Sequence, residues 1–308
     1  MPPRKLIAIV GPTASGKTAL AAALARALGG EIIGADSRQV YRHMDIGTAK
    51  PSSDEQAAAP HHLVDIVDPD QPFSLADWLE RAHAALGDIW SCGKLPLLVG
   101  GTGQYVSALL EGWRVPRVPE QIELRRELAS RRSEDLLAEL RRVDPEAEEY
   151  IDPRNVRRVI RALEVYEATG KPFSHWRTKE PPPFDALIIG LALPREELYR
   201  RVDERVKRMV EAGFTDEVRA LLAMGYSRDL PAMSGIGYKE MCEYLAGERD
   251  LESAIERTKS GTHRLARHQS AWFKQSDKRI KWLPANDPKI VARATALAQA
   301  SASHAVGA

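Results

Sequence analysis

The chain has 308 residues, of which 44% are hydrophobic and 28% charged, and its formal net charge is +1. This composition excludes a disordered or collagen-like chain, and no apolar stretch approaches the length needed to cross a bilayer. Cys92 and Cys242 are the only cysteines and have no partners at metal-binding spacing, so the sequence indicates neither a disulfide framework nor a zinc finger. Because the net charge is close to zero, any binding of nucleic acid has to come from local basic clusters.

The amino-terminal segment predicts a phosphate-binding loop. An apolar run at 6–10 precedes GPTASGKT at 11–18, and an Ala/Leu-rich run at 19–28 comes next, which gives the order strand, loop, helix. Glycines let backbone N–H groups turn around a polyanion, the lysine adds a cation, and the terminal hydroxyl can hold Mg²⁺. The expected site comprises Gly11, Pro12, Thr13, Ala14, Ser15, Gly16, Lys17 and Thr18, with Thr18 as the Mg²⁺ ligand.

Further strands and helices alternate along the first part of the chain. Because the first strand starts close to Met1, we expect no signal peptide, which favours a cytoplasmic protein. The pattern predicts strands at 31–35, 63–67 and 95–99, a helix at about 74–91, and a second glycine-rich turn at 100–103 that opens a helix ending near 112. Such alternation is typical of a parallel, doubly wound α/β sheet like that of P-loop NTPases.

The alternation stops after residue 113. The segment 114–185 is Arg-rich, helical in pattern and interrupted by prolines, so we predict an inserted all-helical domain between core segments 1–113 and 186–308. A strand at 186–193 is expected to return the chain to the sheet, followed by helices over 195–275, a strand at 280–283 and a final helix. The small polar tail from about residue 300 is expected to be disordered.

Two residues stand where parallel strands should end together. Asp36 follows the predicted second strand, and Thr102 lies in the second glycine-rich turn. A carboxylate at this edge can serve as a general base or a metal ligand, and a hydroxyl can face the same crevice. From the residues alone, a turn or helix cap explains each position equally well.

Basic residues gather in three places. Arg154, Arg157, Arg158 and Arg161 recur at helical spacing, as do Arg201, Arg205 and Arg208, and a stretch from Lys259 to Lys281 combines many cations with Trp272, Phe273 and Trp282. Each set is explained either as a solvated or core-packing helix face or as a phosphate-binding surface. The third, which has Asp277 as its single acid, favours nucleic acid, because cations with interleaved aromatics bind the backbone and stack unpaired bases.

Together these segments resemble the tRNA dimethylallyltransferase family, also called tRNA isopentenyltransferases, over nearly the whole chain. The resemblance is carried by GPTASGKT at 11–18, DSRQVYRHMDIGTAKP at 36–51, HHLVDIVDP at 61–69, LLVGGTGQYVSALLEG at 97–112, NVRRVIRALEVYEATGKP at 155–172, SGIGYKE at 234–240, and the helix around Arg267-His268-Gln269 and Trp272. No single motif is specific, but this order is. The absence of a carboxyl-terminal zinc finger favours the bacterial form.

The resemblance implies a prenyl transfer from dimethylallyl diphosphate to the exocyclic N6 amine of the adenosine 3′ of the anticodon, position 37. Asp36 matches the family's general base, and Thr102, which matches a position that the family uses near the tRNA, is expected to act with it. Arg205, ahead of Arg201, is the expected arginine on the diphosphate. The resemblance also implies Mg²⁺ and contacts to the tRNA anticodon stem-loop. The tRNA-contacting residues it implies are Asp36, Ser37, Arg38, Gln39, Thr102, Arg125, Arg157, Arg158, Val159, Ile160 and Arg161.

Three other functions remain open at this point. An adenylate isopentenyltransferase would use free AMP or ATP as the acceptor, but a free nucleotide needs no Arg-rich inserted domain. A small-molecule P-loop kinase would need a lid that the sequence does not clearly show. A non-enzymatic RNA-binding module would use the loop only to sense a nucleotide. We expect no membrane association and a monomer.

Overall fold

The computed structural model describes residues 4–303 and contains a six-stranded sheet in which all pairings are parallel. The strands lie in the order β3-β2-β4-β1-β5-β6. Their bounds are β1 Arg4–Val10, β2 Gly30–Gly34, β3 His61–His62, β4 Leu95–Val99, β5 Phe184–Ala192 and β6 Ile280–Pro284. The predicted parallel α/β sheet is therefore confirmed. Among the described residues there is no helix whose length and hydropathy would let it cross a lipid bilayer.

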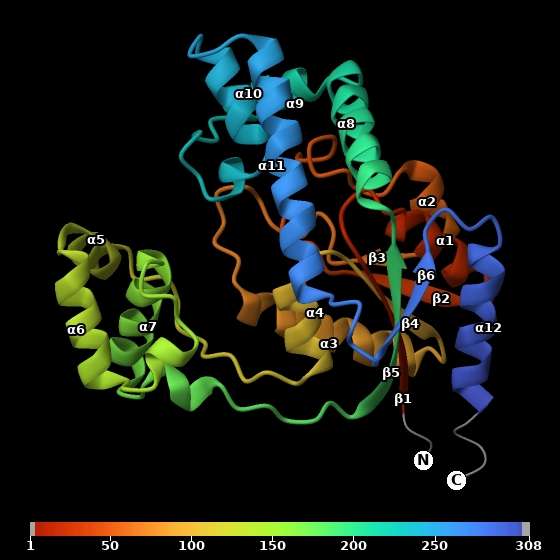
Figure 1. The fold of residues 1–308 in the computed structure, drawn as a ribbon, viewed down its shortest axis with the longest axis horizontal. Coiled ribbons are helices and arrows are strands. Elements are labelled where there is room, and N and C mark those ends of the chain that lie inside the picture. The colour runs from red at the N-terminus through yellow and green to blue at the C-terminus, as the bar shows by residue number, and fades with distance from the viewer. Residues whose placement is uncertain (1–3, 304–308) are drawn as a thin grey trace. The chain divides into compact units, whose positions relative to one another are not determined.

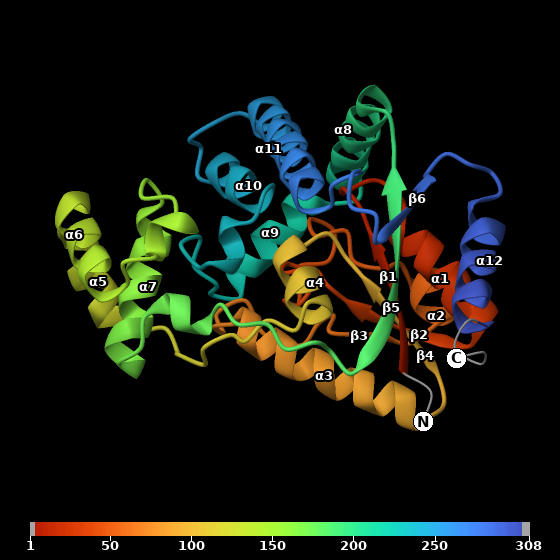
Figure 2. The same ribbon diagram turned by 60° about the horizontal axis from the view of Figure 1, so that its bottom comes forward.

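Helices cover both faces of this sheet (Figures 1 and 2). On one face, α1 (Lys17–Leu28) and α12 (Ile290–Ser303) pack over alternate strand residues such as Ile9, Leu97 and Ile189, all nearly inaccessible to solvent. On the other face lie α3 (Leu75–Ser91) and α4 (Gly103–Leu110), and the indole N–H of Trp78 donates to Gly34 O. Strands buried on both sides explain the continuous apolar runs of the sequence.

The carboxyl ends of the strands face a second group of helices. These are α8 (Arg195–Glu211), α9 (Phe214–Ala223), α10 (Tyr238–Leu245) and α11 (Leu251–Trp272), together with α2 (Ser53–Ala58) and a short 3-10 turn at Ala232–Ser234. Figures 1 and 2 both show α8 following the tip of β5, and α8 and α11 pack against each other. Ligands of parallel α/β proteins bind at this end of the sheet.

A second compact unit consists of residues 74–76 and 111–181. It holds α5 (Ile122–Ser130), α6 (Ser133–Val143) and α7 (Val156–Thr169), with 3-10 turns at Ala147–Glu149 and Phe173–Trp176. The three helices bury a core of their own that includes Leu128, Leu140 and Leu163. The domain boundaries at 114 and 185 stay a prediction.

The predicted third strand is wrong. The pairing residues are His61 and His62 rather than 63–67, because Leu63 and Asp65 adopt left-handed backbone angles, with φ of 64° and 57°. Such angles are incompatible with a strand. Val67 makes only an isolated parallel bridge to Tyr41. The tail expected to be disordered from residue 300 instead continues α12 as far as Ser303, and the remainder of that tail, 304–308, lies outside the described residues.

Candidate active site

A cavity of about 270 Å³ opens where the phosphate loop meets the carboxyl ends of β2 and β4. Thr13, Ala14 and residues 16–19 of the loop and the start of α1 line one side, and Asp36 and Gly101 line it from the ends of the two strands. Gln39 and the segment 48–51 close another side, while Arg205 of α8 and Gln269 of α11 reach it from the helices above. The predicted loop, Asp36 and Arg205 therefore share a single cavity.

The phosphate loop has the backbone geometry that its glycines allow. Gly16, directly before α1, has a φ of 88°, a left-handed angle that a side chain would strain. Lys17 Nζ donates to Pro12 O at 2.7 Å, so the lysine folds back over the loop. Ser15 Oγ is buried without a hydrogen-bond partner among the described residues. Thr18 lines the cavity, and its hydroxyl makes no hydrogen bond within 4–303.

Two cations face this loop. Arg205 Nη1 donates to Thr13 Oγ1 at 3.2 Å, and no ion pair within 4–303 joins Arg205 to a carboxylate. Desolvation, with help from the nearby Arg205, lowers the pKa of Lys17 to about 7, although Asp36 acts to raise it. Desolvation and then Arg208 likewise lower the pKa of Arg205. This arrangement suits an anion, since an anion bound at the loop would relieve both the repulsion between the two groups and the cost of their desolvation.

The other candidate arginine of α8 is already paired. Arg201 Nε donates to Glu197 Oε1 at 2.7 Å, one turn earlier on the helix. Arg201 does not line the main cavity, whereas Arg205 does. The geometry therefore favours Arg205 as the arginine that meets an anion in the loop.

Asp36 and Thr102 lie side by side at the strand ends. Asp36 Oδ1 accepts the Arg38 amide at 2.8 Å, and no hydrogen bond within 4–303 engages Oδ2. Thr102 Oγ1 accepts the Ser37 amide at 3.1 Å, and the Thr102 amide donates to Ala35 O at 3.2 Å. One carboxylate oxygen thus stays available for a substrate proton, and the second glycine turn holds the segment that carries it.

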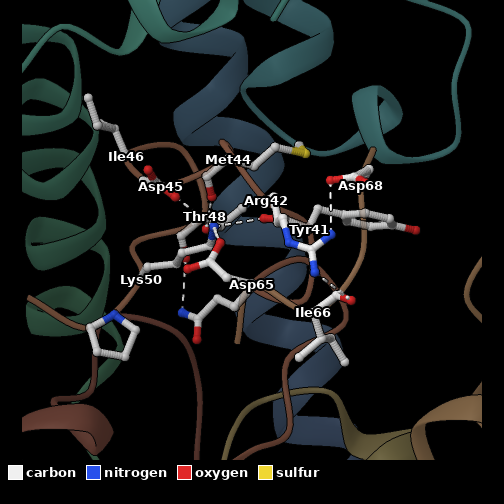
Figure 3. Close-up of polar contacts among 12 residues, drawn as sticks. Tyr41, Arg42, Met44, Asp45, Ile46, Thr48, Lys50, Asp65, Ile66 and Asp68 are labelled. Atoms are coloured by element: carbon white, nitrogen blue, oxygen red, sulfur yellow. Dashed lines mark hydrogen bonds and ion pairs between the residues drawn. The ribbon is translucent and has the colours of Figure 1, made fainter. Parts of the chain in front are cut away.

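The loop that follows Asp36 is held by a buried lysine (Figure 3). The Lys50 side chain is 5% exposed, and its Nζ donates to Tyr41 O at 2.7 Å, to Asp45 Oδ1 at 2.6 Å and to the Asp65 carboxylate. Gln39 Nε2 donates to Thr48 O and Ala49 O across the same loop. Lys50 therefore closes the loop on itself and fastens it to the segment after β3.

A carboxylate from α9 holds the far side of that loop. Glu217 accepts three consecutive amides, of Asp45, Ile46 and Gly47, at 2.8, 2.6 and 3.2 Å, and the Tyr238 hydroxyl at 2.6 Å. Successive backbone N–H groups in a turn form a concave cradle for an anion, which here is a side chain of the protein itself. Sequence reasoning missed both Lys50, which lies in the motif at 36–51, and Glu217, which lies in none of the motifs.

The residues predicted to contact tRNA in the helical unit divide into three groups. Arg125 makes a bidentate pair with Glu164, a fully buried carboxylate that Arg161 also contacts. Arg157 and Arg158 are exposed, and their side chains make no ion pair within 4–303. The side chains of Val159 and Ile160 lie in the core of the unit, so they hold α7 in place rather than present a surface.

The basic stretch of α11 is partly committed to packing. The His263 ring stacks on Tyr199 at 4.0 Å between centroids, and Arg267 Nη1 donates to the Tyr199 hydroxyl at 2.8 Å. Phe273 is buried, whereas Trp272 remains 45% exposed. Of these two aromatic residues, Phe273 belongs to the core, as the core-packing alternative predicts, while Trp272 lies partly at the surface.

Comparison with known proteins places this geometry in a family. The chain matches the family model for IPP transferase over residues 39–276 and that for isopentenyl transferase over residues 4–61. It is 54% identical over 296 residues to a tRNA dimethylallyltransferase of Roseiflexus castenholzii, covering 95% of this chain and 96% of that protein. A tRNA dimethylallyltransferase of Chloroflexus aurantiacus is 55% identical over 284 residues, which cover 91% of this chain and 96% of that protein.

Solved structures agree. The full-length tRNA isopentenylpyrophosphate transferase of Bacillus halodurans superposes with a TM-score of 0.74 at 39% identity, covering 98% of each chain. A eukaryotic dimethylallyltransferase acting on tRNA gives a TM-score of 0.84 at 30% identity and covers 98% of this chain and 80% of that one. Both the fold and the sequence motifs thus have close parallels.

Proposed function

The chain belongs to the tRNA dimethylallyltransferase family, and from that premise we propose that it transfers a dimethylallyl group from dimethylallyl diphosphate to the N6 amine of adenosine 37 in tRNA. One observation carries the proposal: an anion-binding loop and a carboxylate with a free oxygen line the same cavity. That pairing suits a reaction in which an anion leaves while a nucleophile loses a proton.

The phosphate loop supports the leaving group. When the bond between C1 of the dimethylallyl group and the diphosphate oxygen breaks, both bonding electrons stay on the diphosphate. Lys17, Arg205 and the loop N–H groups beyond Thr13, other than that of Ser15, which donates to Pro12 O, stabilise this developing charge. These groups are fixed before the donor arrives, so little reorganisation is needed during the reaction.

Asp36 supports the acceptor. The N6 lone pair of adenine is delocalised into the ring, so the amine is a weak nucleophile until its proton is removed. As the N6–C1 bond forms, the proton passes from N6 to the free Oδ2 of Asp36, while Oδ1 remains bonded to the Arg38 amide. Thr102 keeps the carboxylate in place through the Ser37 amide.

Thr18 suits a magnesium ion. Mg²⁺ bound with a diphosphate takes few protein ligands and keeps several waters, so a single hydroxyl suffices. Thr18 Oγ1 has no partner within 4–303 and lines the cavity, and the orphaned Ser15 Oγ lies in the same loop. When bound, Mg²⁺ adds positive charge against the leaving diphosphate.

The tRNA would be gripped through its anticodon stem-loop. Ser37, Arg38, Gln39 and Thr102 surround Asp36, and the exposed Arg157 and Arg158 offer cations to the phosphate backbone. We assign Arg125 and Arg161 a supporting role beside Glu164 in the helical unit. The target adenine has to leave its stack to reach the cavity, which costs least in a single-stranded loop.

Mass spectrometry of tRNA nucleosides before and after incubation with the enzyme, dimethylallyl diphosphate and Mg²⁺ tests the proposal. We expect isopentenyladenosine at one position of unmodified tRNA and no product without enzyme. If free AMP were modified as readily as tRNA, the acceptor assignment would fail. Phosphorylated products formed from ATP would instead establish a kinase, and tRNA that binds yet stays unmodified would indicate an RNA-binding module.

A further inference from the structure

We propose that Gln269 of α11 is a positioning residue of the transfer reaction: its carboxamide fixes the phosphate loop relative to the second glycine turn, and so sets the donor against Asp36. The proposal rests on the proposed function, since it assigns a residue to that reaction. Gln269 is 7% exposed, lines the cavity and belongs to neither the phosphate loop nor the strand ends.

Its contact with the phosphate loop is direct. Gln269 Oε1 accepts the backbone N–H of Thr13 at 2.7 Å, across 256 residues of sequence. Because Pro12 has no N–H and the Thr13 N–H is taken, the amides left for a diphosphate start beyond Thr13. Gln269 thus fixes the end of the loop at which Arg205 also contacts the Thr13 hydroxyl.

The other end of the carboxamide lies against the second turn. An N–H donor has to meet the oxygen of an amide, so the Thr13 bond fixes which way the group faces. Nε2 then lies so close to Gly101 that a Cβ there would stand 2.2 Å away. Nε2 itself makes no hydrogen bond within residues 4–303. One planar group therefore spans the gap between the two turns.

These two turns carry the reacting groups. Gly101 precedes Thr102, whose hydroxyl holds the amide beside Asp36, and the phosphate loop holds the leaving group. The end of α11 also packs closely on the second turn, since a Cβ on Gly103 would lie 2.1 Å from the Trp272 ring. A shift of about 1 Å between donor and acceptor reduces rates by roughly a hundredfold, so a group that fixes both turns acts on the rate.

The experiment compares Gln269→Met with Gln269→Glu and uses Ser270→Ala as the matched control. Methionine keeps the length of glutamine but cannot accept the Thr13 N–H well, whereas glutamate still accepts it and adds a negative charge beside the diphosphate. Ser270 is the next residue and is exposed, and among residues 4–303 its hydroxyl bonds only to Ala266 O of the same helix. Steady-state kinetics with dimethylallyl diphosphate and tRNA give kcat and the donor KM for each enzyme.

For Gln269→Met we expect kcat to fall by about tenfold or more, with the tRNA dissociation constant within about twofold of wild type. For Gln269→Glu we expect kcat to stay within about threefold while the donor KM rises by about tenfold or more. If Gln269 only stabilised the fold, the two variants would not differ in this way, with one lowering kcat and the other raising the donor KM. A wild-type kcat for Gln269→Met, or an equal loss of kcat in both variants, overturns the proposal.

A double-mutant cycle gives an independent readout. Gly101→Ala should displace Nε2 and lower kcat, but in a Gln269→Ala background it should add less than about twofold. Additive losses contradict the proposal. If the wild-type enzyme transfers no dimethylallyl group, the proposed function fails. The inference is then judged by calorimetric binding of pyrophosphate, which Gln269→Glu should weaken and Ser270→Ala should leave unchanged.

Discussion

The amide of Ser37 donates to the hydroxyl of Thr102 at 3.1 Å, which joins two strand ends that are 65 residues apart in the sequence. Gly100 makes the approach possible, because a Cβ there would stand 2.0 Å from Ala35 O. The segment that carries Asp36 is thus packed directly on the second glycine turn. The placement of the carboxylate is therefore a property of the sheet edge and does not depend on a surface loop.

Replacing Asp36 by alanine should lower dimethylallyl transfer by about a hundredfold or more, because the amine then loses its proton to water alone. Filter binding should show an affinity for tRNA close to that of wild type. Asp185→Ala is the control, since Asp185 is exposed and, in the described part of the chain, pairs only with Lys5. Unchanged turnover in Asp36→Ala would remove this residue from the role of base.

Donor binding should take up a proton at Lys17. Its pKa is lowered to about 7 in the free protein, so above that pH the amine is largely neutral, while a bound diphosphate favours the ammonium. Donor affinity should therefore decline as the pH rises through 7. Calorimetry at pH 8 in two buffers of different ionisation enthalpy measures the uptake directly, and we expect close to one proton per site.

Arg205→Gln provides the check on this assignment. Arg205 helps to lower the pKa of Lys17, so its removal should raise that pKa. The pH at which donor affinity declines should therefore move to a higher value, while donor binding weakens by about tenfold. Arg201→Gln should change donor binding by less than about threefold, since Arg201 is paired with Glu197. If this pH does not change in Arg205→Gln, Arg205 does not influence the pKa of Lys17, and the assignment is wrong.

Lys50→Met should loosen the loop between Tyr41 and Lys50 (Figure 3). The variant leaves Asp45 and Asp65 unpaired, but both are largely exposed and regain water, so we expect to lose only about 1–2 kcal/mol of unfolding free energy. Transfer should fall by about tenfold, because Gln39 and residues 48–51 line the cavity. Amide hydrogen exchange should become faster in residues 39–50 and stay unchanged elsewhere, and this measurement tests the prediction. Lys94→Met, which removes an exposed ion pair elsewhere, should leave both transfer and exchange unchanged.

Glu164→Gln should destabilise the helical unit by about 2–4 kcal/mol, since it removes a fully buried carboxylate from Arg125, Arg161 and the Gln121 amide. Burial acts to raise the pKa of Glu164, but these hydrogen bonds outweigh it and leave the pKa below its usual 4.5. The stabilisation is therefore present above pH 4.5 and lost as the pH falls through the folded value. Thermal unfolding of Glu164→Gln measures this stabilisation. Glu148→Gln is the control, since it removes an exposed ion pair with Arg141.

Local sequence signals predicted the sheet and pointed to residues that line its main cavity. Five of the six strands were predicted from apolar runs, most of them bounded by glycine or proline, and the phosphate loop follows from its motif, because both depend on neighbours in the sequence. The strand at 63–67 was mispredicted because the left-handed angles at Leu63 and Asp65 suit a segment tied down by Lys50. That ion pair links residues 15 apart, which a periodicity argument does not see.

The residues that sequence reasoning missed act over longer separations. Glu217 meets backbone amides about 170 residues away, and backbone amides leave no signature in the side-chain pattern. Gln269 did leave a weak signal in the sequence. It lies on the buried side of α11 with Ala266 and with Phe273 just after the helix, and a polar residue on a buried helix face needs a hydrogen-bond partner. The partner, the Thr13 amide, became visible only in three dimensions.

The hydrogen bond between Thr13 and Gln269 joins an early and a late part of the chain, which affects when the site is completed during translation. Translation delivers the phosphate-gripping turn within the first twenty codons, but its restraint arrives only after α11 has been made and has left the exit tunnel. Because Arg205 and Gln269 come from α8 and α11, the cavity around the phosphate loop is complete only after both helices have been synthesised.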